Sequence, residues 1–132
     1  AVRAKIGMVF QEPRLLPWRT ASENINLVLS DTKKTLPDAK AWLARVGLHD
    51  AAGLYPNELS GGMAQRVALC RALASPSDTV LLDEPFRGLD PATRLHVMDT
   101  VRQATCNAGR SLLLVTHDEG EAAFFTERIV RL

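Results

Sequence analysis

TVLLDEP at residues 79–85 decides the fold class of this 132-residue chain. An apolar run ends there at two adjacent carboxylates, Asp83 and Glu84, and Pro85 keeps the strand from simply continuing. A short, nearly continuous apolar run is typical of a strand that is covered on both faces of a parallel sheet. Open parallel sheets bind ligands at the carboxyl ends of their strands, where these two acids fall. We therefore predict an α/β protein with a ligand site at this edge.

Three further runs have strand character, at residues 6–10, 112–115 and 129–132. Helical patterns separate the last three strands, which gives a β-α-β-α-β order. The first of these helices is predicted to start at Asp90, to turn Leu95, Met98, Val101 and Thr105 inward, and to stop by Gly109. The second is predicted over residues 118–125.

The segment from about residue 18 to residue 74 has helical signals and no convincing strand. Helices are predicted after a capping box at 20–23, from Asp38 to Gly47, and from Ser60 to Ala74. We predict one domain over 1–132, with an α/β portion at 1–12 and 76–132 and a helical subdomain at 13–75.

Composition excludes several classes of protein. The net charge is +1, with 16 basic and 15 acidic residues mixed along the chain, so no basic patch points to nucleic acid. No apolar run approaches the roughly 20 residues of a membrane helix. The two cysteines, Cys70 and Cys106, are expected to be buried reduced thiols of a cytosolic protein.

The sequence LSGGMAQ at residues 59–65 predicts an anion site. Ser60 is a helix N-cap type, and Gly61 and Gly62 leave the backbone N–H groups of the first turn unobstructed. Free N–H groups at a helix N-terminus suit phosphate. Paired glycines cost about 1 kcal/mol each in a helix interior, so a ligand that approaches the backbone closely explains them.

Gln11 and His117 each follow a predicted strand directly, as Asp83 and Glu84 do. Because the carboxyl ends of parallel strands share one edge, the four side chains are expected to gather there. A carboxylate at this position can hold Mg²⁺, and its neighbour can deprotonate an attacking water.

With these motifs on one chain, the sequence resembles the nucleotide-binding subunit of ABC transporters along essentially its whole length. Residues 59–65 match the family signature, residues 81–85 match Walker B with its catalytic glutamate, and residues 88–90 match the D-loop. Gln11 matches the Q-loop glutamine and His117 the switch histidine. Residues 11–18 and 60–66 look like importers of the nitrate, sulfonate and taurine class.

The resemblance implies a P-loop NTPase (RecA-like) sheet with an inserted helical subdomain, and a cofactor set of ATP and Mg²⁺. Glu84 and His117 are then the catalytic residues, and Asp83 and Gln11 serve the metal. The nucleotide-binding set is Ser60, Gly61, Gly62, Gln65, Gln11 and Asp90. In a head-to-tail homodimer, Ser60, Gly61 and Gly62 meet the γ-phosphate held by the opposite subunit.

The resemblance also implies a peripheral position on the cytoplasmic face of the inner membrane. The partner there is a transmembrane permease, with a solute-binding protein as an indirect partner and no nucleic acid. Leu15, Leu16 and Trp18 either dock on the permease or only anchor the helical block.

The pattern G-x-x-x-x-G-K-[ST] is absent, and none of the 8 glycines is followed by lysine. We therefore expect the chain to begin after the phosphate-binding loop and to be nearly inactive alone. Gly88 also departs from the small residue, Ser or Ala, that is commoner in the D-loop. One alternative is a non-catalytic docking or regulatory module. The other is an ABC ATPase outside transport, although only 48 residues separate Gln11 from Ser60 and leave no room for a long coiled coil.

Overall fold

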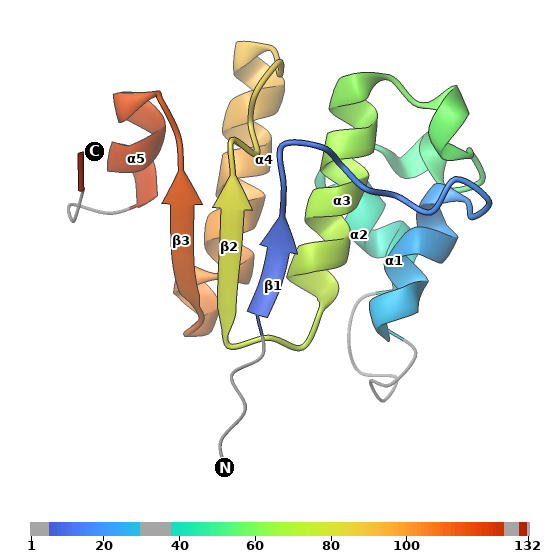
Figure 1. The fold of residues 1–132 in the computed structure, drawn as a ribbon, viewed down its shortest axis with the longest axis horizontal. Coiled ribbons are helices and arrows are strands. Elements are labelled where there is room, and N and C mark those ends of the chain that lie inside the picture. The colour runs from blue at the N-terminus through green and yellow to red at the C-terminus, as the bar shows by residue number, and fades with distance from the viewer. Residues whose placement is uncertain (1–5, 30–37, 126–129, 132) are drawn as a thin grey trace.

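A computed structural model describes residues 6–29, 38–125 and 130–131 of the chain. Three strands form one parallel sheet in the order β1 (Ile6–Val9), β2 (Thr79–Asp83) and β3 (Ser111–Val115). All three strands run in the same direction (Figure 1), so their carboxyl ends lie at one edge of the sheet. The predicted parallel α/β arrangement is confirmed.

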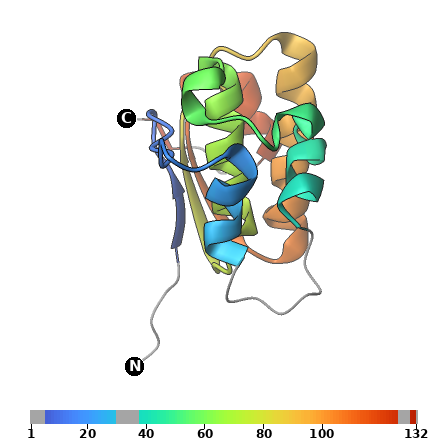
Figure 2. The same cartoon turned by 90° about the vertical axis from the view of Figure 1, so that its right-hand side faces the viewer.

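The helices lie mainly to one side of this sheet (Figure 2). They are α1 (Ala21–Leu29), α2 (Ala39–Arg45), α3 (Gly61–Ala74), α4 (Pro91–Ala104) and α5 (Glu119–Phe125). Short 3-10 turns occupy His49–Ala51, Pro56–Glu58 and Cys106–Ala108. No helix within the described residues is long and apolar enough to cross a membrane.

The predicted helix starts are confirmed by the hydrogen bonds that cap them. Asp38 accepts from Ala41 N at 2.8 Å, and Ser60 accepts from Met63 N at 3.1 Å. At α1 the predicted capping box forms, because Thr20 N donates to Glu23 Oε1 and Glu23 N donates to Thr20 Oγ1. Each cap satisfies a backbone N–H group that the helix itself leaves without a partner.

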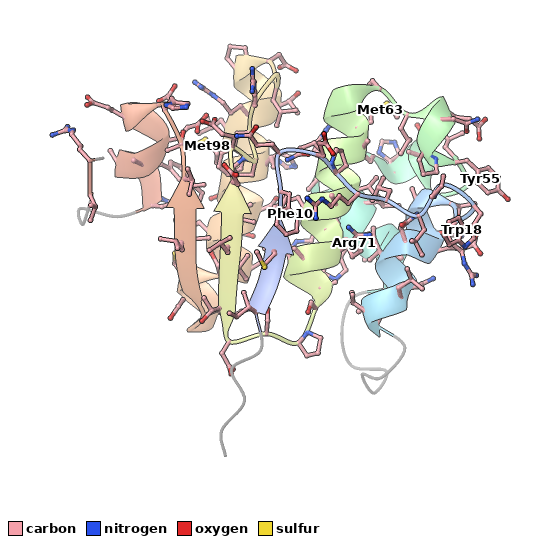
Figure 3. All side chains as sticks on the ribbon, viewed as in Figure 1. Phe10, Trp18, Tyr55, Met63, Arg71 and Met98 are labelled. Atoms are coloured by element: carbon pink, nitrogen blue, oxygen red, sulfur yellow. The ribbon has the colours of Figure 1, made fainter. Side chains whose placement is uncertain are left out.

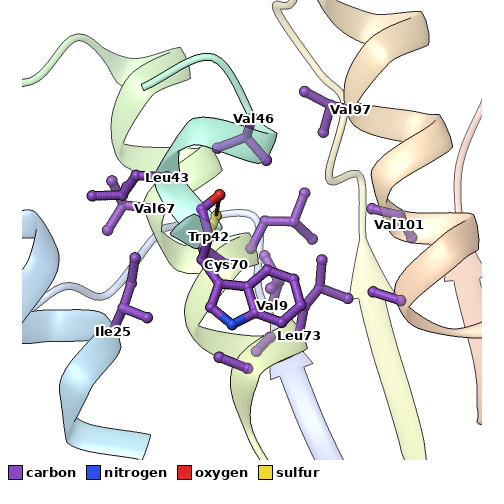
Figure 4. Close-up of a cluster of buried hydrophobic side chains, with 14 of the residues drawn as sticks. Val9, Ile25, Trp42, Leu43, Val46, Val67, Cys70, Leu73, Val97 and Val101 are labelled. Carbon is purple, nitrogen blue, oxygen red and sulfur yellow. Dashed lines mark hydrogen bonds between the residues drawn. The ribbon is translucent and has the colours of Figure 1, made fainter. Parts of the chain in front are cut away.

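A single apolar core fills the space between the helices and one face of the sheet (Figure 4). Val9, Val80 and Leu82 enter it from the strands, and Leu43 and Leu69 enter it from the helices. These five side chains are at most 2% exposed. The core therefore fixes the helices against the strands whose ends carry the candidate site.

Among the described residues nothing covers the other face of the sheet, which we call the bare face, and this corrects the prediction of strands covered on both faces. Ile6, Met8, Leu113 and Val115 are 55%, 43%, 55% and 47% exposed, and they alternate with residues that point into the core. Successive side chains of a strand point to opposite faces. A continuous apolar run does not reveal whether the chain itself supplies a cover for each face.

Two predicted details of the C-terminal half also differ. Leu95 is 59% exposed, whereas Met98, Val101 and Thr105 are buried as predicted. At about 100° per residue, Leu95 falls roughly opposite Val97, which the core buries. The strand predicted over 129–132 lies partly outside the described residues, and neither Val130 nor Arg131 is in a strand.

Candidate functional site

The four residues predicted at the sheet edge are brought to that edge. Gln11 follows β1, Asp83 is the last residue of β2 with Glu84 next to it, and His117 lies just beyond β3. Gln11 and Glu84 line the same pocket. His117 Nε2 lies 3.2 Å from Glu84 Oε1. Three segments far apart in the sequence thus meet at one site.

Glu84 has the most constrained carboxylate of the group. Its backbone is left-handed, with φ of 50°, and its amide donates to Val115 O at 2.9 Å. The side chain is 13% exposed. Oε1 is buried and accepts no hydrogen bond from the described residues, despite the nearby imidazole of His117. A buried carboxylate oxygen without a donor is costly, so this atom is suited to accept a hydrogen bond from a ligand or a bound water.

The His117 ring is 97% exposed, and its Nε2 faces Glu84 Oε1, while hydrogen bonds of its neighbours fix the loop that carries it. Asp118 N donates to Thr116 Oγ1 at 3.0 Å, and Thr116 Oγ1 donates to Glu121 Oε2 at 2.6 Å. Arg94 of α4 forms ion pairs with Asp118 and Glu121 at 3.1 and 3.4 Å. The loop is therefore fixed while the imidazole stays open to a ligand.

The first turn of α3 is open, as the glycine pair predicts. A Cβ at Gly61 would meet nothing within 4 Å, and one at Gly62 would only touch Leu89 Cδ2 at 3.5 Å. Ser60 and Gly61 are exposed. The Met63 N–H of this turn is capped by Ser60 Oγ, whereas the glycine pair leaves the approach to the Gly61 and Gly62 N–H groups open to an anion.

The pocket that joins these parts encloses about 210 Å³. It is lined by Gln11, Pro13, Gly61, Gln65, Glu84 and Arg87. The first turn of α3 therefore reaches the strand ends within one chain. Asp83 and His117 do not line this pocket.

Sequence analysis missed Arg87, which adds a cation to the pocket. Its amide donates to Glu84 O at 3.4 Å, and its side chain is exposed. A basic residue three positions after Glu84 was the available signal, since a positive charge suits a site for phosphate.

Gln65, predicted as a nucleotide contact, is 6% exposed, and its Nε2 donates to Phe10 O at 3.3 Å. Asp90, from the same predicted set, caps α4, and its carboxylate accepts from Thr93 N at 3.0 Å. Hydrogen bonds from Thr93 hold the pKa of the Asp90 carboxyl below its usual value.

The oxygen donors suit Mg²⁺ more than a soft metal. Gln11 and Asp83 offer an amide and a carboxylate oxygen at neighbouring strand ends, and no cluster of three His, Cys, Asp or Glu forms within the described residues. Magnesium is commonly held by one or two carboxylates together with waters and substrate phosphates. The donor set therefore fits a phosphate-bound Mg²⁺ and not an all-protein metal cage.

Comparison with known proteins agrees with this geometry. Residues 1–87 match the family model described as ABC transporter. The chain belongs to the ABC transporter family. An aliphatic sulfonates import ATP-binding protein of Frankia alni is 48% identical over 131 residues, which are 99% of this chain and 53% of that protein. A protein of the same description from Pseudomonas aeruginosa is 44% identical, over 95% of this chain and 50% of its own length.

Among solved structures, a dimeric ATP-binding cassette in a post-hydrolysis state, bound to ADP and Pi, is similar to this ABC transporter chain. It has a TM-score of 0.81 and 35% identity over 92% of this chain and 56% of its own. The same cassette in a second dimeric structure gives a TM-score of 0.77. The chain spans about half the length of the curated relatives it matches. The fold is thus the mixed helix and parallel-sheet fold of ABC cassettes.

Proposed function

We propose that this chain is the part of an ABC import ATPase that senses and hydrolyses ATP. The observation that carries the proposal is Glu84 Oε1, a buried oxygen that accepts no hydrogen bond from the described residues although His117 Nε2 lies 3.2 Å away, beside a pocket that Gln11 and Gly61 also line. This arrangement places a proton acceptor beside Gln11, at the ends of β1 and β2, where a phosphate-bound metal would lie. Hydrolysis of a phosphoanhydride requires such a proton acceptor and neutralisation of the phosphate charge. In the head-to-tail dimer proposed below, the anion site at Gly61 serves the nucleotide of the opposite subunit.

Each residue has a role in this proposal. Glu84 accepts the proton of the attacking water, and His117 contacts the γ-phosphate from its exposed ring. Asp83 and Gln11 hold Mg²⁺, which supplies charge neutralisation on the phosphate oxygens when bound. Ser60, Gly61, Gly62 and Gln65 form the signature surface for nucleotide, and Asp90 supports the interface. Positioning and charge account for most of the rate in phosphoryl transfer.

We base the proposed assembly on the proteins and dimeric cassettes to which this chain is similar. Two copies of the whole protein form a head-to-tail homodimer with two ATP molecules at the interface, as a peripheral complex on the cytoplasmic side of a membrane permease. A solute-binding protein delivers the solute to that permease. Aliphatic sulfonates are the proposed class of solute, because the similar proteins of Frankia alni and Pseudomonas aeruginosa are named for their import. The division into an α/β portion and a helical subdomain at 13–75 belongs to the same proposal.

The variant Glu84→Gln in the full-length protein tests the catalytic assignment. We expect ATP turnover to fall by about a hundredfold or more, because the amide cannot accept the proton. Dimerisation on addition of ATP should persist, since the amide keeps the shape and leaves the phosphate contacts intact. Asp50→Asn, at an exposed carboxylate, is the matched control and should leave both unchanged. Unchanged hydrolysis in Glu84→Gln removes Glu84 from this role.

Calorimetric titration of the 132 residues with MgATP tests what the chain does alone. We expect no binding at millimolar ATP, because the chain lacks the lysine-bearing loop that supplies most phosphate binding. Tight binding that Ser60→Arg abolishes would instead show that the first turn of α3 captures nucleotide unaided. That result would favour a binding module over an inactive part of an ATPase.

A further inference from the structure

The segment that carries Gln11 is held against α3 at both of its ends. We call this segment, Phe10–Arg14, the glutamine strap. At its start, Gln65 Nε2 donates to the carbonyl of the first strap residue at 3.3 Å. At its end, Arg71 Nη2 donates to the carbonyls of the last two strap residues at 3.2 and 3.1 Å. Figure 3 shows Arg71 on α3 beside the chain that leaves β1. Gln11 is exposed between these two attachment points.

Arg71 is a charged residue whose side chain is only partly open to solvent. Its side chain is partly buried, and burial lowers the pKa of its guanidinium. No ion pair joins Arg71 to a carboxylate among the described residues. Its guanidinium donates instead to two carbonyls of the strap, those of Pro13 and Arg14. Partial burial of a charge without a counter-ion is unfavourable unless hydrogen bonds compensate for it. The planar guanidinium suits this task, because one donor group can reach adjacent carbonyls.

The strap depends on this attachment because its own backbone is strained. Arg14 has a left-handed φ of 51°, which is unfavourable for a residue other than glycine. Its guanidinium folds back over the Phe10 ring, 4.1 Å from the ring centroid, and closes the bend on itself. Such a conformation persists only where its surroundings hold it. The hydrogen bond from Arg71 to Arg14 O supplies a restraint at the strained residue itself.

We propose that Arg71 is a positioning residue that sets where Gln11 presents its side-chain oxygen. The proposal rests on the proposed function, in which Gln11 serves the Mg²⁺ of bound nucleotide. Arg71 does not line the pocket that Gln11 and Glu84 share, so in this proposal it acts through the strap. Since α3 also begins at Gly61 in the signature surface, one rigid helix connects the phosphate-facing turn to the metal-facing glutamine.

The first test compares Arg71→Met and Arg71→Lys in the full-length protein. Methionine keeps much of the apolar volume of the arginine side chain and removes its hydrogen-bond donors. Lysine keeps the positive charge but has a single ammonium group in place of the planar guanidinium. We expect Arg71→Met to lower kcat about tenfold and to raise the Mg²⁺ concentration for half-maximal turnover several-fold, with KM for ATP nearly unchanged. Arg71→Lys should recover part of both losses. Arg102→Met, at a half-buried arginine on α4, is the control and should change neither quantity.

The second test asks whether the effect passes through Gln11. In a Gln11→Ala background, Arg71→Met should lower kcat by less than about twofold, because residues that act as a unit are not additive. An equal loss with and without Gln11 overturns the proposal and makes Arg71 a general stabiliser of the helical block.

Hydrogen exchange gives a readout that does not require turnover. In Arg71→Met, or in Arg71→Lys if the methionine variant does not fold, the amides of the glutamine strap should exchange faster while those of β2 do not. Unchanged strap exchange overturns the proposal whatever the kinetics show. An inactive wild-type protein would contradict the proposed function alone, because the exchange comparison still tests how the strap is held.

Discussion

The two thiols differ in environment and should differ in reactivity. Cys70 is buried in the core, its Sγ donates to Trp42 O, and burial raises the pKa of its thiol to about 12. Cys106 is exposed, which corrects the expectation that both cysteines are buried. Because the thiolate is the reactive form, iodoacetamide at pH 8 should alkylate Cys106 and leave Cys70 intact in the folded chain. Mass spectrometry of the labelled peptides measures this, and the unfolded chain should label at both. Equal rates in the folded chain would show that the core opens readily.

Gly7 lies so close to its neighbours that no side chain fits at this position without movement. An added Cβ would lie 2.9 Å from Ala72 O and 3.0 Å from Ser77 Oγ, so β1 and α3 would have to separate. We expect Gly7→Ala to lower the free energy of unfolding by about 1–3 kcal/mol. Gly53→Ala is the matched control, because a Cβ there meets nothing within 4 Å. Urea titration of both variants checks the difference, and equal stability would contradict the close approach.

Sequence reasoning placed the site residues well and their local contacts poorly. Gln11, Glu84 and His117 could be placed at one edge because parallel strands end together. The buried Glu84 Oε1, which accepts no hydrogen bond from the described residues, could not be predicted, because its burial depends on β3 and His117, which are distant in the sequence. Arg71 carried no signal either, since its partners are backbone carbonyls that no side-chain pattern reveals.

Arg110 joins the ends of several elements through backbone carbonyls. Its guanidinium donates to the carbonyls of Leu73, Ser75, Ser77 and Ala104 at 2.8–3.1 Å and also to Ser77 Oγ. We expect Arg110→Met to cost about 3 kcal/mol, because it leaves the carbonyls at the ends of α3 and α4 without this donor. Arg102→Met, which loses a partly exposed ion pair with Asp99 and a cation–π contact with Phe124, should cost about 1 kcal/mol. Chemical denaturation separates the two, and similar losses would contradict a special role for Arg110.

The start of α5 should make stability depend on acid pH. A hydrogen bond from the Glu121 amide, with a smaller contribution from Arg94, holds the pKa of the Asp118 carboxyl below its usual value. A carboxyl with a lowered folded-state pKa stabilises the fold above its unfolded pKa, and this contribution disappears as the pH falls through the folded value. Asp118→Asn should therefore destabilise the protein at pH 7 and make little difference below about pH 3. Thermal unfolding across this range tests the sign, and a difference that grows on acidification would contradict it.

Helix boundaries were more predictable than the environment of the strands. Each N-cap side chain accepts a hydrogen bond from an amide only three residues further along the chain, so a local sequence pattern predicts it. This holds for Asp38, Ser60 and Asp90. Leu95 was misplaced because the face of α4 that meets the core depends on how the helix sits against the sheet. The bare face of β1 and β3 was missed for the same reason, since cover is supplied by other elements.

At the scale of the whole molecule, the two faces of the sheet differ in effect. The face covered by helices stabilises the fold, whereas the bare face favours association. The core on the helix side is continuous and gives the chain an interior of its own. On the other side, β1 and β3 present Ile6, Met8, Leu113 and Val115, and both are edge strands of the sheet. Apolar faces beside unpaired strand edges are sites of association. The aqueous behaviour of these 132 residues should therefore be set by this surface and not by their nearly neutral charge.

We predict that the isolated 132-residue chain self-associates through this face. Light scattering across micromolar concentrations should show a mass that rises with concentration, because association removes apolar surface from water at about 25 cal/mol per Å². Leu113→Lys places a charge on the bare face and should shift the chain toward monomer. Leu95→Lys is the matched control, since Leu95 is similarly exposed, 59% against 55%, but lies on α4 away from that face. A monodisperse monomer at all concentrations, or an equal response to both lysines, would show that the bare face does not drive association.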